Sequence, residues 1–95
     1  MKSITVAALK NLLTEKQDLI LIDVREEHER NVFNIGGIHI PLDSIVENLD
    51  QIPTDKTVVL YCRKGIRSFI AIQRLQRKLP FENLVNLEGG LDAWD

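Results

Sequence analysis

The sequence has few of the residue types that commonly form metal sites or covalent cross-links. It holds one cysteine, Cys62, and two histidines, His28 and His39, among 95 residues. A single cysteine excludes a disulfide within the chain. The two histidines have no cysteine or helical partner at ligand spacing, so we expect no metal site. Cys62 is therefore either an inert core residue or the reactive centre.

Long apolar runs and a secretory leader are also missing. No apolar stretch approaches the roughly 20 residues that a membrane span requires, and the first residues lack the pattern of a signal peptide. We therefore expect no membrane association and a cytoplasmic location. The net charge of −2 gives no indication of nucleic-acid binding. The length, with 44% hydrophobic and 27% charged residues, predicts one compact domain over residues 1–95.

Acidic residues are absent from one window of the chain. Residues 56–81 contain no aspartate or glutamate, yet they hold seven of the twelve basic residues. Cys62 lies inside this window. We therefore expect a local positive field that favours its thiolate form and attracts small anions.

The residues on either side of Cys62 predict a strand, a loop and a helix. Thr57–Tyr61 is an apolar, β-rich run typical of a strand that is covered on both faces. From Ser68 the apolar residues follow a helical period, namely Ala71, Ile72, Leu75 and Leu79. The turn over 62–67 can direct backbone N–H groups toward one point beside a helix N-terminus, which favours an anion. Ser68 is expected to be the N-cap of that helix.

The rest of the chain predicts an α/β fold. The apolar run over residues 18–24 predicts a second buried strand, with Asp23 near its carboxyl end. Further strands are expected near residue 4 and over 38–40 and 84–87, and helices over 5–15 and 43–49, with a weakly helical stretch over 26–34. Right-handed crossovers then give a mainly parallel sheet with helices on both faces. Asp23 and Cys62 both fall at carboxyl ends of strands, where such sheets bind ligands.

Four segments resemble, in order, the motifs of the single-domain rhodaneses, a sulfurtransferase family. They are LIDVREEHE over 21–29, NIGGIHIPL over 34–42, CRKGIRS over 62–68 and LEGGLDAW over 87–94. The resemblance implies a rhodanese-like fold. It also implies that Cys62 takes a sulfane sulfur from a donor, holds it as a persulfide and passes it to a nucleophilic acceptor.

This chemistry assigns roles to the residues of the loop. It needs an exposed Cys62 thiolate, a ring of N–H donors for the outer sulfur and cations for an anionic donor. The expected substrate-binding residues are Arg63, Lys64, Gly65, Ile66 and Arg67. Among them, Gly65 permits a tight backbone, and the Arg67 guanidinium can approach the sulfur or an adjacent carboxylate.

Three charged residues outside the loop can be interpreted in two ways. Asp23, Arg25 and Glu29 could form an acid–base group, but the resemblance favours a structural role. It implies that Arg25 and Glu29 form an ion pair that braces the loop. We therefore expect Asp23, Arg25, Glu29 and Ser68 to support the loop.

The leading hypothesis is a rhodanese-type sulfurtransferase that needs no cofactor. Its donor would be thiosulfate, a small anion, or a persulfide, and with one cysteine the acceptor must be external: a thiol, cyanide or a protein. One alternative is a sulfur-carrier or binding module for protein partners. A less favoured one is a phosphatase or arsenate reductase, because only four residues separate Cys62 from Arg67, whereas the related phosphatases have a longer loop.

Overall fold

The computed structural model describes residues 1–94, so Asp95, the last residue of the expected domain, lies outside the described part. Five strands form one sheet: β1 (Lys2–Ile4), β2 (Leu19–Asp23), β3 (Ile38–His39), β4 (Thr57–Tyr61) and β5 (Leu84–Leu87). The helices are α1 (Val6–Thr14), α2 (Glu27–Val32) and α3 (Ile66–Gln76), with 3-10 helices η1 (Leu42–Ser44), η2 (Leu49–Gln51) and η3 (Gly90–Ala93). Within residues 1–94, no helix is long and apolar enough to cross a membrane.

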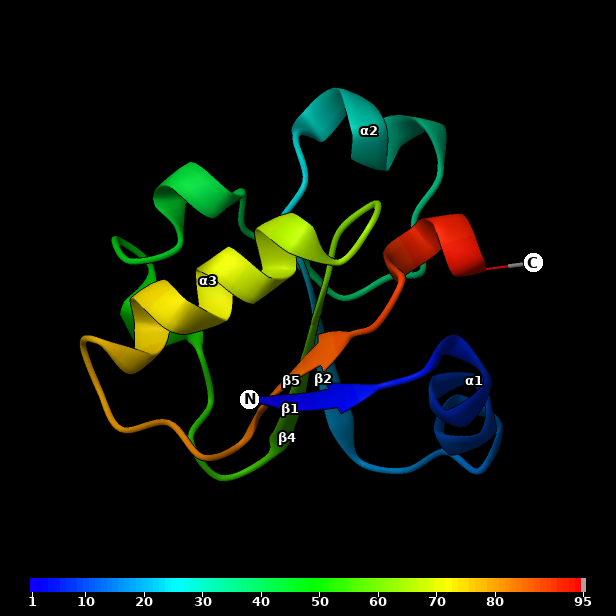
Figure 1. Ribbon diagram of the computed structural model, residues 1–95, viewed down its shortest axis with the longest axis horizontal. Helices are drawn as coiled ribbons and strands as arrows, with labels where there is room; N and C mark the ends of the chain where they lie inside the picture. The colour runs from blue at the N-terminus through cyan, green and yellow to red at the C-terminus, as the bar shows by residue number, and fades with distance from the viewer. Residues whose placement is uncertain (95) are drawn as a thin grey trace.

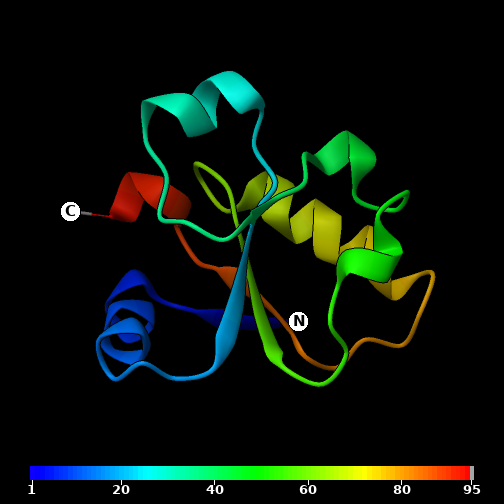
Figure 2. The same ribbon diagram turned by 180° about the vertical axis from the view of Figure 1, so that it is seen from behind.

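All neighbouring strands run parallel, in the order β1-β5-β4-β2-β3. One face packs against α3, η1 and η2 through a core that includes Ile22, Leu60 and Ile72. The other face packs against α1 and η3 through Leu9, Val59 and Leu87. Figures 1 and 2 show α1 and α3 on opposite sides of the strands. The predicted α/β class, with helices on both faces of a parallel sheet, is confirmed.

Strand β4 is the centre of this arrangement. It pairs with β2 on one side and β5 on the other, and its residues from Val58 to Tyr61 are fully buried. This position explains why the strand has no polar alternation, since both of its faces contact apolar side chains. The strand delivers Cys62 to the carboxyl edge of the sheet.

Two of the predicted helices differ from the structure. The helix expected over 43–49 does not form: the 3-10 helices η1 and η2 lie at its two ends, with turns over 45–48 between them. The Asn48 side chain donates to the Ser44 carbonyl (2.8 Å), which in an α-helix would accept the Asn48 main-chain N–H. Helix α3 begins at Ile66, two residues earlier than expected, and Leu79 lies beyond its end and is half-exposed.

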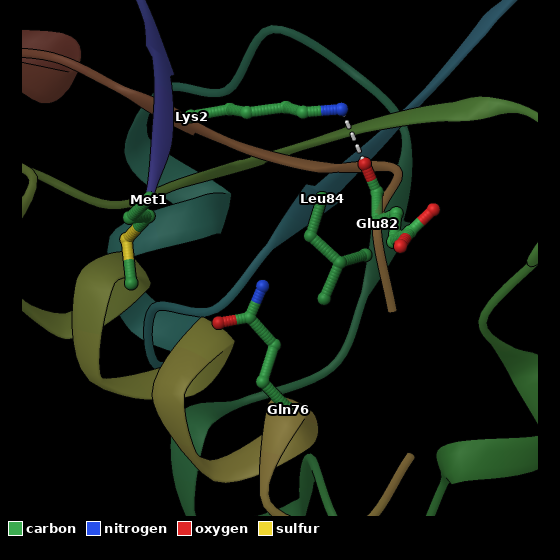
Figure 3. A pocket seen from close by; sticks show the side chains of 5 residues that line it. All are labelled: Met1, Lys2, Gln76, Glu82 and Leu84. Atoms are coloured by element: carbon green, nitrogen blue, oxygen red, sulfur yellow. Dashed lines mark hydrogen bonds between the residues drawn. The ribbon is translucent and has the colours of Figure 1, made fainter. Parts of the chain in front are cut away.

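A pocket of about 510 Å³ lies where β1 begins and α3 ends. Its walls are Met1, Lys2, Gln76, Glu82 and Leu84. Figure 3 shows the Lys2 ammonium donating a hydrogen bond to the Glu82 carbonyl at its rim. This pocket lies at the opposite edge of the sheet from Cys62, because parallel strands place their amino and carboxyl ends on opposite edges.

Candidate active site

The thiol group of Cys62 lies at the floor of a cavity. Cys62 directly follows β4 and is only 1% exposed. The cavity above it has a volume of about 310 Å³ and is lined by Cys62, Arg63, Lys64, Ile66 and Arg67. The expectation of an exposed sulfur was therefore wrong: the following loop folds over the end of the central strand, so that a reactant must enter the cavity to reach Sγ.

Two backbone N–H groups converge on the sulfur. The Gly65 N–H donates to Sγ at 3.1 Å, and the Ser68 N–H donates to it at 3.4 Å. The convergence depends on Gly65, whose φ of 93° is in the left-handed region. That conformation turns the chain directly into α3, so the sulfur faces the first turn of the helix. Both contacts favour negative charge on sulfur.

A buried polar chain continues behind the sulfur. The Ser68 hydroxyl lies 3.4 Å from Sγ and donates to Oδ1 of Asn86, while Nδ2 of Asn86 donates to the Gly65 carbonyl at 3.1 Å. Ser68 is not the N-cap that we expected. The cap position belongs to Gly65, because α3 begins earlier, and Ser68 instead lies fully buried in the first turn. Asn86 was not predicted from the sequence to belong to the site, although an asparagine inside the apolar strand β5 was a detectable signal.

The C-terminal 3-10 helix η3 holds the loop from the other side. The Leu91 N–H donates to the Cys62 carbonyl (3.0 Å), and the Asp92 N–H donates to the Arg63 carbonyl (2.9 Å). Gly90 permits this approach, because a Cβ there would lie 2.5 Å from both carbonyl oxygens. The Gly89–Gly90 pair lies in the turn that leads into η3, and its contact with the loop was not predicted from the sequence.

Carboxylates from outside residues 56–81, the stretch without acidic residues, neutralise two of the three loop cations. Arg67 forms a bidentate pair with Glu29 of α2, with distances of 2.6 and 2.9 Å. Arg63 contacts Asp92 of η3 at 3.2 Å, at an exposed position. Within residues 1–94, no carboxylate lies within salt-bridge distance of Lys64. The positive field inferred from the sequence is therefore weaker than the loop composition suggests.

Pairing changes the pKa values of both Glu29 and Arg67. The hydrogen bonds from Arg67 lower the pKa of Glu29 from its ordinary 4.5 to about 2, and they outweigh the opposing effect of burial. The same carboxylate raises the pKa of Arg67, and Cys62 contributes in the same direction. Of the two partners anticipated for Arg67, the sulfur and an adjacent carboxylate, the structure provides the carboxylate as its hydrogen-bonded partner.

A second, more buried ion pair lies at the end of β2. Arg25 donates from Nε and Nη2 to the two carboxylate oxygens of Asp23, each at 2.9 Å, and also to the Phe33 carbonyl. Burial alone would raise the pKa of Asp23, but the hydrogen bonds from Arg25 bring it below its usual value. The predicted ion pair between Arg25 and Glu29 is wrong. Each has a nearer partner, because the first turn of α2 presents Glu29 to Arg67 of the loop, while Arg25 turns back to Asp23 of its own strand.

Arg30 of α2 is a further residue that sequence reasoning did not assign to the site. Its guanidinium contacts Asp23 at 3.3 Å and donates to the Gly37 carbonyl at 2.9 Å. It therefore ties α2 to β2 and to the glycine turn before β3. Together with Asp23 and Arg25, it holds α2 beside the loop.

The fold and site define a class of protein: a parallel α/β domain with one cysteine in an anion-stabilising loop between a central strand and a helix. A model of the Rhodanese-like domain family matches residues 5–95. The chain belongs to this family, as the resemblance predicted.

Named relatives and a solved structure agree with this assignment. Putative sulfurtransferase YtwF of Bacillus subtilis is 38% identical over 95 residues, covering 99% of this chain and 90% of that protein. Probable adenylyltransferase/sulfurtransferase MoeZ of Mycobacterium tuberculosis is 37% identical over 97% of this chain, which spans only 24% of that protein. The crystal structure of a rhodanese-like domain protein from Staphylococcus aureus superposes with a TM-score of 0.89, at 33% identity, covering 100% of this chain and 92% of that chain. Both relatives have sulfurtransferase in their names.

Proposed function

We propose that this protein is a sulfurtransferase in which Cys62 cycles between a thiolate and a persulfide. The observation that carries the proposal is the position of Sγ, which receives two N–H donors at the floor of a cavity. An inert core cysteine needs neither the donors nor the cavity. Both features suit a sulfur that bears negative charge during a reaction.

The proposed reaction has two displacements. The Cys62 thiolate attacks the sulfane sulfur of the donor, so that an S–S bond forms and the donor residue leaves with its electron pair; for thiosulfate, the leaving group is sulfite. An external thiolate or cyanide then attacks the outer sulfur, and Cys62 leaves as a thiolate. The loop residues Arg63, Lys64, Gly65, Ile66 and Arg67 bind the donor, and Asp23, Arg25, Glu29 and Ser68 support the loop.

Mass spectrometry of the intact protein tests this proposal. After incubation with thiosulfate, or with a low-molecular-weight persulfide, the wild type should gain the mass of one sulfur atom and release it to cyanide. Cys62→Ser should show neither event. Failure of the wild type to gain sulfur from both donors, or transfer by Cys62→Ser, would refute the proposal.

A second candidate function is a sulfur carrier that receives sulfur from a protein. The pairing of Arg63 with Asp92 and of Arg67 with Glu29 favours it, because a small anionic donor then meets Lys64 as the one unneutralised loop cation in the described residues. Incubation with a cysteine desulfurase and cysteine distinguishes the two. Loading of Cys62 much faster than from thiosulfate supports the carrier, and absence of loading argues against it.

A further inference from the structure

The buried chain from Cys62 through Ser68 to Asn86 contains one hydroxyl proton with two possible acceptors. Ser68 Oγ lies within hydrogen-bond distance of both Asn86 Oδ1 and Cys62 Sγ. Ser68 is fully buried and Asn86 is 8% exposed. A hydroxyl has a single proton, so it can donate to only one of the two at a time.

The orientation of the Asn86 amide decides where that proton lies. A carbonyl only accepts, so the contact at 3.1 Å with the Gly65 carbonyl requires Nδ2 on that side. Oδ1 is then turned toward Ser68 and accepts its hydroxyl proton. In this arrangement Ser68 Oγ presents a lone pair to the sulfur, which suits a thiol S–H but not a thiolate.

We propose that Asn86 is a positioning residue that competes with Cys62 for the Ser68 hydroxyl proton and thereby limits the formation of the Cys62 thiolate. When the thiol loses its proton to water in the cavity, the Ser68 hydroxyl rotates from Oδ1 to Sγ. It then becomes the third donor to the sulfur, beside the N–H groups of Gly65 and Ser68. This inference deepens the proposed function, because it rests on the same sulfur being the nucleophile.

The proposal predicts opposite effects from two neighbouring substitutions. Ser68→Ala removes the donor, so the pH midpoint for alkylation of Cys62 by iodoacetamide should rise by about 0.5–1 pH unit. Asn86→Ala removes the competing acceptor, so the midpoint should fall by a similar amount. In the Ser68→Ala background, Asn86→Ala should have no further effect, because the hydroxyl through which it acts is gone.

Charges around the sulfur are unchanged by these substitutions. They are Arg63, Lys64 and Arg67 in the loop and α3, Glu29 on α2, Asp92 on η3, and Asp23 with Arg25 at the end of β2.

The matched control is Asn83→Ala. Asn83 also joins two carbonyls through its amide, those of Pro53 and Lys56 at 2.7 Å each, but it precedes β5 at the opposite edge of the sheet. The Asn83→Ala variant should lose stability, but the pH midpoint for alkylation of Cys62 should not change.

The proposal would be overturned if Ser68→Ala and Asn86→Ala shifted the midpoint in the same direction, or if neither shifted it. An equal shift for Asn83→Ala would also overturn it. If Asn86→Ala does not fold, Asn86→Asp replaces it. Its carboxylate should raise the midpoint more in the wild-type background than in Ser68→Ala, and an equal rise in both would also overturn the proposal. Alkylation requires no sulfur donor, so these results are independent of whether the protein transfers sulfur.

Discussion

The ion pair between Glu29 and Arg67 should make the stability of this protein depend on acid pH. The change to test is Glu29→Gln, which removes the charge but keeps the side-chain length and an acceptor for the Glu26 N–H. Lowering the pKa of Glu29 from 4.5 to about 2 sets an upper limit of about 3.5 kcal/mol, since each pH unit corresponds to about 1.4 kcal/mol. The side chains are 21% and 33% exposed, so solvent screening reduces the expected value to about 1–2 kcal/mol.

The sign of the pH effect follows from the direction of the pKa change. The folded protein holds Glu29 ionised at a lower pH than the unfolded chain does. The stabilisation is therefore complete above the unfolded value, at about pH 5 and higher, and is lost as the pH falls toward about 2. Asp23 also has a lowered pKa and acts in the same direction in both proteins, so the difference between wild type and variant isolates Glu29.

Urea unfolding from pH 7 to pH 2.5 measures this difference. The gap between wild type and Glu29→Gln should be about 1–2 kcal/mol at pH 7 and should close toward pH 2.5. Glu27→Gln is the matched control, because it removes the same charge from an exposed position of the same helix. Parallel stability curves for wild type and Glu29→Gln, or an equal pH-dependent change in the control, would refute the reasoning.

Two further predictions concern the loop. Asp92→Asn frees Arg63 and should raise kcat/KM for thiosulfate about two- to fivefold at low salt. Lys64→Ala should lower kcat/KM without a matching loss of melting temperature. Steady-state kinetics that show no gain for Asp92→Asn would contradict the first of these expectations. Gly90→Ala should cost about 2–4 kcal/mol, because its Cβ would meet the Cys62 and Arg63 carbonyls at 2.5 Å. Gly36→Ala is its control: its φ is also positive (+92°, against +59° for Gly90), but a Cβ there would have open space around it, so thermal unfolding should show a clearly smaller loss.

Local sequence was sufficient to predict the strands and the position of Cys62 at the end of one of them. The run from Thr57 to Tyr61 has no polar alternation because β4 is covered on both faces, so burial is visible in the sequence itself. Parallel topology then places the ends of β2 and β4 at one edge. For this reason the sequence alone located Asp23 and Cys62 on the same rim.

Only the tertiary structure decided which charges meet around the loop. Residues 56–81 lack acids, yet α2 and η3 bring Glu29 and Asp92 to Arg67 and Arg63 across 38 and 29 positions of chain. Such pairings depend on helix placement and side-chain reach, which no local pattern encodes. The same holds for Asn86, whose amide reaches the loop from β5. By itself, the sequence determined the fold class and the cysteine loop; packing determined the burial of Sγ, the neutralisation of the loop cations and the polar chain behind the sulfur.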